Sequence, residues 1–112
     1  MGSLVFDGQS IEFDDPLLAH LQIVIVQKLS RGESLLVSWM NSLTIGDGRT
    51  SIWINPTLPL RFNFAGSRSP AIDRDWLAAL TTSASHSTGL IVVNRDGSLA
   101  RCGGFTPVAR HR

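Results

Sequence analysis

The chain has 112 residues, the length of one typical domain, and 43% of them are hydrophobic against 17% that are charged. Its formal net charge of +1 is unevenly divided: residues 1–48 carry six acids and two bases, whereas residues 49–112 carry eight arginines and three acids. This division excludes a uniformly basic nucleic-acid coat and an acidic disordered tail.

The sequence gives no sign of a membrane or secretory protein. No run approaches the roughly 18 uncharged apolar residues of a membrane span. The N-terminus, MGSLVFDG, lacks the basic and apolar regions of a secretory signal. Cys102 is the single cysteine, so an intrachain disulfide is excluded. We therefore expect a cytoplasmic location and no membrane partner.

The first predicted elements are a β-hairpin and a helix. Strand-like runs at residues 4–6 and 11–13 flank Asp7-Gly8, which is a hairpin turn signal. Asp15 as N-cap, followed by Pro16, begins a helix that is expected to end at Arg31-Gly32. Its predicted core-facing stripe is Leu17, Leu18, Leu21, Val24, Ile25 and Leu29.

Three strands are predicted next, over residues 34–40, 50–55 and 60–64. Because short turn-rich segments separate them, an antiparallel meander is the economical pairing. In this pairing, Trp39 and Trp53 lie on neighbouring strands and are expected to form a cross-strand pair.

A second helix and a last strand complete the predicted domain. Ser69-Pro70 is expected to begin the helix by the same capping logic. A four-residue apolar run at 90–93 is the last strand. The predicted stripe of the helix is Ile72, Trp76, Ala79 and Leu80.

The predicted fold class is therefore α+β, a single compact domain over residues 1–94. Its element order is ββαβββαβ, with an antiparallel sheet and two helices. Residues 95–112 are expected to form a basic tail containing Gly and Arg, with one extra edge strand as the alternative.

Two glycine-bearing loops are candidate sites for an anion or a partner. Asp47 and Arg49 lie in the loop at residues 46–50, where glycines permit close backbone approach. Arg68 precedes the predicted start of the second helix, where free amides attract anions. Arg74 is a further candidate. The alternative interpretation is that the first loop merely connects two strands, and that Ser69 caps the helix while Arg68 is solvated.

The sequence provides no catalytic constellation and implies no cofactor. It contains neither a P-loop nor a G-x-S-x-G elbow, and no His/Cys/Asp spacing typical of zinc, so we predict no catalytic residue and no metal ligand. A face for self-association is suggested by apolar residues of the first helix that lie off its main stripe. This predicted homo-oligomer face comprises His20, Ile23, Val26 and Gln27.

Several ordered segments between Met1 and Asn94 resemble a family of small, uncharacterised actinobacterial proteins whose members often carry the label "ATP-dependent DNA ligase". The segments include MGSLVFDG, LAHLQ at 18–22, KLSRGES at 28–34, GDGRTSIW at 46–53, GSR at 66–68 and RDWL at 74–77. The tail from Arg95 departs from the family's pattern. Ligase chemistry needs a lysine nucleophile in the pattern Lys-x-Asp-Gly, and Lys28, the sole lysine, is followed by Leu-Ser-Arg. The resemblance therefore does not imply ligase activity.

Three functions remain open at this point. A non-enzymatic binding or assembly domain ranks first. A nucleic-acid-binding accessory protein that uses loop and tail arginines ranks second. A nucleotide- or anion-binding protein, or a ligase-related enzyme, ranks third. The candidate arginines of the second hypothesis are Arg49, Arg61, Arg68, Arg95, Arg101, Arg110 and Arg112.

Overall fold

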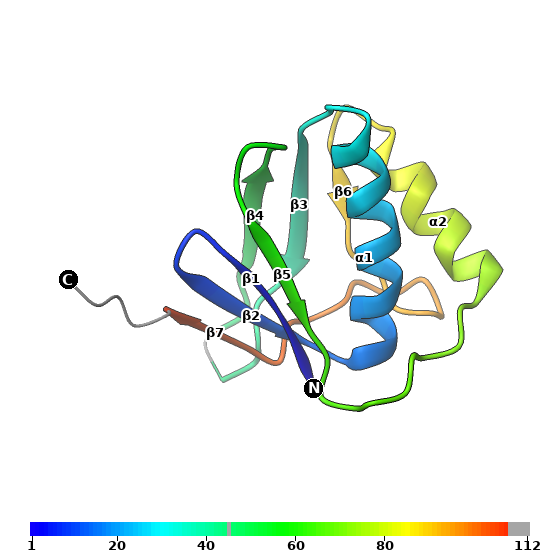
Figure 1. The fold of residues 1–112 in the computed structure, drawn as a ribbon. Helices are drawn as coiled ribbons and strands as arrows, with labels where there is room; N and C mark the ends of the chain where they lie inside the picture. The colour runs from blue at the N-terminus through cyan, green and yellow to red at the C-terminus, as the bar shows by residue number, and fades with distance from the viewer. Residues whose placement is uncertain (45, 108–112) are drawn as a thin grey trace.

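A computed structural model describes residues 1–44 and 46–107, and it confirms the α+β class (Figure 1). The tail residues 108–112, with the candidates Arg110 and Arg112, lie outside the described part. The elements in chain order are β1 (Gly2–Phe6), β2 (Gln9–Phe13), α1 (Asp15–Ser30), β3 (Leu35–Met40), β4 (Arg49–Ile54), β5 (Leu60–Asn63), α2 (Arg74–Ala84), β6 (Leu90–Ile91) and β7 (Gly104–Pro107).

The strands form two sheets rather than one antiparallel sheet. Sheet A has the order β5-β1-β2-β7, and sheet B has the order β4-β3-β6, with β6 parallel to β3. The predicted meander is therefore wrong, because β5 leaves β4 and pairs with β1. Pro56 and Pro59 between β4 and β5 donate no backbone hydrogen bonds, and the Asn55 side chain holds a turn by accepting from the Thr57 amide at 3.0 Å.

The predicted hairpin is confirmed. β1 and β2 are joined by Asp7 and Gly8, with φ values of 47° and 75°. Two successive positive φ values are those of the type I′ turn, whose twist matches that of antiparallel strands.

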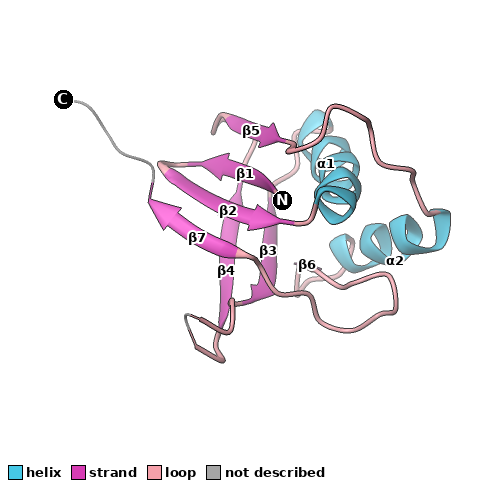
Figure 2. Ribbon diagram, turned by 90° about the horizontal axis from the view of Figure 1, so that it is seen from below, coloured by secondary structure: helices cyan, strands magenta, loops and turns pink. Residues whose placement is uncertain are grey.

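The core lies between the two sheets and the two helices, which Figure 2 shows beside each other at one end of the sheets. Trp39 is buried and packs edge-on against Phe13, with ring centroids 5.6 Å apart. The predicted Trp39–Trp53 pair is wrong, because the register places Trp53 opposite Leu36 and Trp39 opposite Thr50. The two tryptophans therefore point to opposite faces of sheet B.

Both helices begin differently from the prediction. α2 begins at Arg74 rather than at Ser69-Pro70, because the carboxylate of Asp73 accepts hydrogen bonds from the amides of Asp75 and Trp76 at 3.0 and 3.1 Å. At α1 the N-cap position is Asp14, without a side-chain cap bond, and Asp15 lies inside the helix. On the predicted second stripe, Trp76 and Leu80 are buried, whereas Ile72 and Ala79 are exposed.

The segment after Asn94 continues the fold. Ala100 and Cys102 are buried in the core, and β7 pairs with β2 as an edge strand. The carbonyl oxygen of Ala100 accepts from the Met40 amide at 2.9 Å, and the Cys102 amide donates to the carbonyl oxygen of Met40 at 3.0 Å. A loose tail thus does not describe residues 95–107, and the edge-strand alternative fits residues 104–107.

Candidate binding surface

Sheet B has one face in the core and one face that no other helix or strand of the described residues 1–44 and 46–107 covers. Along β3 and β4, buried residues alternate with exposed or half-buried ones, as expected for a sheet packed on one side. The buried residues face the core that sheet B shares with sheet A and the helices; in Figure 2, sheet A crosses in front of β3 and β4, and both helices lie beside them. We call the other side the outer face; it carries Leu36, Ser38, Met40, Arg49, Ser51, Trp53 and Ile91.

The outer face is unusually apolar for a surface open to water. Trp53 is 58% exposed, Leu99 beside the sheet is 57% exposed and Ile91 is 36% exposed. A hollow of about 370 Å³ lies on this face, and most of its wall is apolar. Its lining includes Leu36, Ser38, Met40, Arg49, Ser51, Ile91 and Leu99. A concave apolar surface with a few polar groups is typical of a binding site.

Polar groups also line the hollow. Ser38 and Ser51, directly opposite each other on β3 and β4, are joined by a 2.7 Å hydrogen bond between their Oγ atoms. Arg49, a candidate residue from the sequence, lies at the beginning of β4 with its side chain exposed. These groups can orient a partner on an otherwise apolar surface.

Asp47, the other candidate of that loop, has a local structural role. Its Oδ1 accepts from Nη2 of Arg101 at 3.0 Å, and Nη1 of the same guanidinium donates to the carbonyl oxygen of Asn41 at 2.9 Å. Asp47 thus holds the segment before β7 against the loop between β3 and β4.

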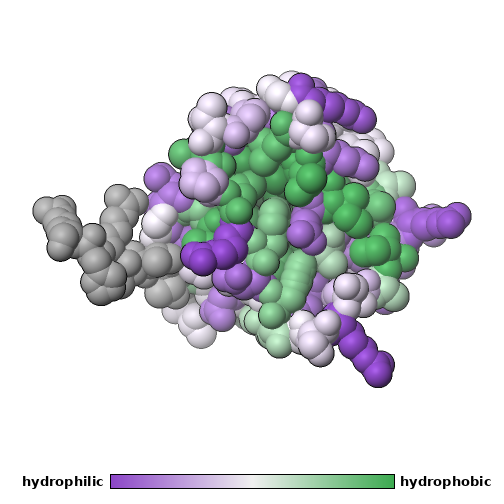
Figure 3. All heavy atoms as spheres, in the orientation of Figure 1, coloured by the Kyte–Doolittle hydropathy of each residue, from purple (hydrophilic) through white to green (hydrophobic). Residues whose placement is uncertain are grey.

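A second hollow, of about 410 Å³, lies between α1, β5 and the loop at residues 65–72. Arg68, a candidate for anion binding, lines it together with Ile23, which belongs to the predicted self-association face of the first helix. Val26 and Gln27 are exposed on α1. Figure 3 shows apolar atoms gathered over α1 and β5 on this side of the molecule. Arg49 and Arg68 therefore line separate hollows that share no residue, and Arg74 is exposed in the first turn of α2.

The loop before Arg68 already serves an acid of this chain. The amides of Ala65 and Gly66 donate to the carboxylate of Asp15 at 3.1 and 2.9 Å. These hydrogen bonds, that of Gly66 foremost, hold the pKa of Asp15 below its ordinary value. An external anion at these amides would have to displace a carboxylate, and no helix begins at Ser69, so this loop is a poor anion site.

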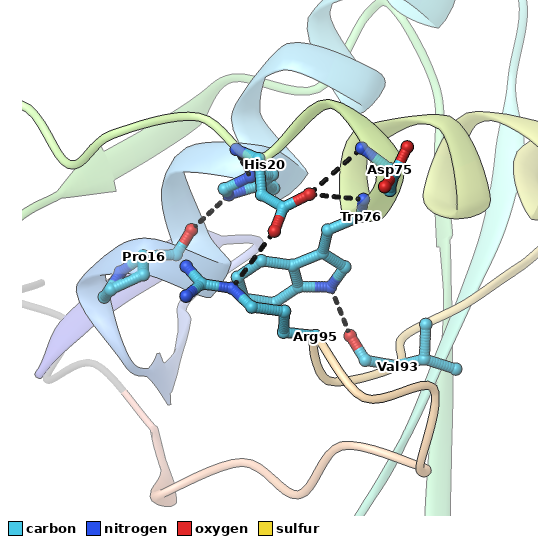
Figure 4. A network of polar contacts seen from close by, with 7 residues as sticks. Pro16, His20, Asp75, Trp76, Val93 and Arg95 are labelled. Carbon is cyan, nitrogen blue, oxygen red and sulfur yellow. Dashed lines mark hydrogen bonds and ion pairs between the residues drawn. The ribbon is translucent and has the colours of Figure 1, made fainter.

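His20 belongs to the interior rather than to an association face. It is fully buried, its Nδ1 lies 2.6 Å from the carbonyl oxygen of Pro16, and its Nε2 accepts from the amide of Asp73 at 2.9 Å (Figure 4). These partners fix the neutral tautomer with the proton on Nδ1. The expectation of a surface histidine is wrong because α2 covers this side of α1, stacking Trp76 on the imidazole at 4.3 Å between ring centroids.

The sequence did not reveal the contacts that surround Trp76. Its indole Nε1 donates to the carbonyl oxygen of Val93 at 2.9 Å, and the guanidinium of Arg95 lies 5.3 Å from its ring centroid (Figure 4). Arg95 also lies 3.5 Å from the carboxylate of Asp73. The ring nitrogens of His20 and Trp76 thus all have hydrogen-bond partners within the chain. The cluster of His20, Trp76 and Arg95 joins α1, α2 and the segment after β6.

The outer-face role of Trp53 was also missed. One signal was present, because Ser51 and Arg49 stand two and four residues before Trp53 on the same strand. Side chains two apart share a face, so the arginine and serine indicate that this face of the strand is exposed.

Among residues 1–44 and 46–107, no group of three or more histidine, cysteine, aspartate or glutamate side chains could hold a metal ion. None of the helices in this part of the chain has the length and apolar character needed to cross a membrane.

Comparisons with known proteins identify a family and no activity. Neither a curated protein nor a solved structure matches the chain. A family model described as "Domain of unknown function (DUF7882)" matches residues 1–95, which is most of the chain. The chain therefore belongs to the DUF7882 family.

Proposed function

We propose that the chain is a cytoplasmic binding or assembly domain without catalysis of its own, and that the outer face of sheet B is its binding surface. The observation that supports this most is the exposure of Leu99 and Ile91 at one apolar hollow, with Trp53 exposed on the same face of sheet B. Leaving large apolar groups in water is costly, and several of them on one face of a small domain commonly mark a contact with another molecule.

Binding is better supported than catalysis. The polar residues that line the hollow are Arg49, Thr88 and a pair of serines bonded to each other, and in the described part of the chain no histidine or carboxylate lines it to act as a general base. Lys28, the only lysine, lies in the last turn of α1, 3.7 Å from Glu33, where it is suited to a helix-end ion pair. The ligase label of the resembling family finds no support in this placement.

Nucleic-acid binding has weaker support and stays a prediction. Of its candidate arginines, Arg95 and Arg101 lie beside Asp73 and Asp47. Arg49 and Arg68 line separate hollows. At Arg95 and Arg101, phosphate binding would therefore have to compete with carboxylates of the same chain.

The proposed surface can be tested by photo-crosslinking in the native cells. A photoreactive benzoylphenylalanine replaces Leu99 on the outer-face hollow in one variant and Gln27 on α1 in a matched variant. We expect a discrete covalent adduct from position 99 and none from position 27. Adducts from position 27 alone would move the binding surface to α1 and β5, and no adduct from either position would contradict a binding function.

A further inference from the structure

The free edges of the two sheets differ in how well they are protected against pairing with another chain. At one edge of sheet A, β5 follows Pro59 and carries the charged Arg61 within it. At the other edge, β7 ends in Pro107. In sheet B, β6 is only two residues long. Proline, charge and shortness are the devices by which natural proteins block edge-to-edge association.

β4 is an edge strand without these devices. It has six residues, its register with β3 is continuous and free of bulges, and its sequence RTSIWI contains no proline. Its only charge is at its first residue, and Thr, Ile and Trp favour strands. Such an edge offers unpaired amides and carbonyls to another strand.

We propose that the partner at this edge is a second copy of this chain, whose β4 pairs antiparallel with the first about a two-fold axis at Ser51. The two copies of sheet B then form one continuous six-stranded sheet. This inference rests on the proposed function, because it names the partner at the β4 edge of the outer face. The hollow beside Ile91 and Leu99, on the β6 side, stays open in this pair for the contact that the crosslinking tests.

The sequence of β4 is complementary to itself in this register. Centring the pair on Ser51 places each Arg49 opposite the partner's Trp53, and both side chains lie on the outer face. An arginine beside an exposed indole forms a cation–π contact, and the symmetry makes this contact twice. At the centre, Ser51 meets the partner's Ser51, repeating the serine pair that β3 and β4 already form at 2.7 Å.

Neighbouring registers make poorer pairs. A pair centred on Ile52 places Trp53 opposite Ser51 and moves Arg49 beyond the end of the partner strand. A shift by one residue brings outer-face side chains onto the buried side. The Ser51 register alone keeps both outer faces on one side and pairs the charge with the aromatic ring.

The test is a charge exchange between two variants, R49E and W53R, followed by sedimentation equilibrium. Wild-type protein is expected to dimerise reversibly between about 10 µM and 1 mM, as suits an interface at the small end of the range. R49E removes both cation–π contacts, and W53R places two arginines opposite each other, so each variant alone should dimerise about tenfold more weakly or worse.

The mixture of the two variants reports the register. In a mixed dimer the glutamate at position 49 of one chain faces the arginine at position 53 of the other, while the remaining Arg49 keeps its Trp53. Equal amounts of R49E and W53R should therefore form a dimer that neither forms alone. R61E, with the same charge change on the edge strand β5, is the matched control and should dimerise as wild type does.

Failure of this inference is distinguishable from failure of the proposed function. A wild-type chain that stays monomeric at about 1 mM overturns the dimer. So does a dimer that R49E and W53R leave unchanged, or a mixture without recovery. If the chain is monomeric and position 99 still crosslinks to a different protein, the outer face remains a binding surface with another occupant. Both replaced side chains are exposed, so circular dichroism should show a native fold in every variant.

Discussion

Asp15 joins the beginning of α1 to the loop after β5. Each of its carboxylate oxygens accepts a backbone hydrogen bond, from residues fifty and fifty-one positions further along the chain. These bonds favour the charged form and lower the pKa of Asp15 below its ordinary value of 3.8. A lowered folded-state pKa means that this contribution to stability is complete above the unfolded value and is lost as the pH falls through the folded value.

We predict that D15N lowers stability at neutral pH and flattens its acid dependence. The amide can offer only one acceptor oxygen where the carboxylate offers two. The difference in urea midpoint between wild type and D15N should be full above about pH 5 and should shrink toward about pH 2. D14N is the matched control, since Asp14 makes no side-chain cap bond. Equal midpoints for D15N and D14N at neutral pH would contradict the role given to Asp15.

The burial and backbone conformation of a residue are predictable where they depend on its neighbours in the sequence. They are not predictable where they depend on a distant segment of the chain. The stripe of α1 and the turn at Asp7-Gly8 follow from spacing and backbone preference, and both are confirmed. His20 is different, because its burial depends on the Asp73 amide, 53 residues away. Trp53 is exposed because it lies on the outer face of sheet B, which its residue type does not reveal.

Strands and helices follow from short-range patterns, whereas their pairing does not. Each strand expected between residues 34 and 64 exists within a residue or two of its predicted bounds. Alternation makes Leu60 and Phe62 the inward side of β5, but it does not specify whether β1 or β4 is the neighbour. Parallel pairing of β6 with β3 depends on the helical crossover α2, and no local signal encodes it.

Gly89 fixes how α2 returns to sheet B. Its φ is +82°, and a Cβ added there would collide with the backbone oxygen and Cβ of Leu36 on the neighbouring strand. Glycine is therefore needed for two reasons, its backbone conformation and the close approach to β3.

We predict that G89A is much more damaging than G97A. Gly97 has a similar φ of +88° but nothing within 4 Å of an added Cβ, so G97A isolates the cost of the left-handed conformation, about 1 kcal/mol. G89A adds a collision with backbone that cannot rotate away, for a total of about 3 kcal/mol. Urea unfolding of both variants measures the difference. Similar losses for the two would mean that β6 can move away from β3 at little cost.

At the scale of the whole molecule, the fold extends beyond the segment that the family model matches. The family model covers residues 1–95, yet Ala100 and Cys102 are buried in the core and β7 forms an edge of sheet A. The composition of this segment, rich in glycine and arginine, favours a tail, and its few apolar residues are too dispersed to form a periodic pattern. Its order comes from backbone hydrogen bonds to Met40 and Glu12, which sequence patterns do not show.

Two shortened chains test whether residues 95–107 belong to the folding unit. A chain ending at Asn94 loses two buried side chains and the backbone bonds of Ala100 and Cys102 to Met40, and it leaves β2 as an open edge. We expect it to be less stable by about 3 kcal/mol or more, with a smaller m-value because less surface is buried. A chain ending at Pro107 retains all of these contacts and should unfold at the wild-type urea concentration. If the chain ending at Asn94 unfolds as late and as cooperatively as wild type, residues 1–94 form the whole folding unit and β7 is only an attachment to it.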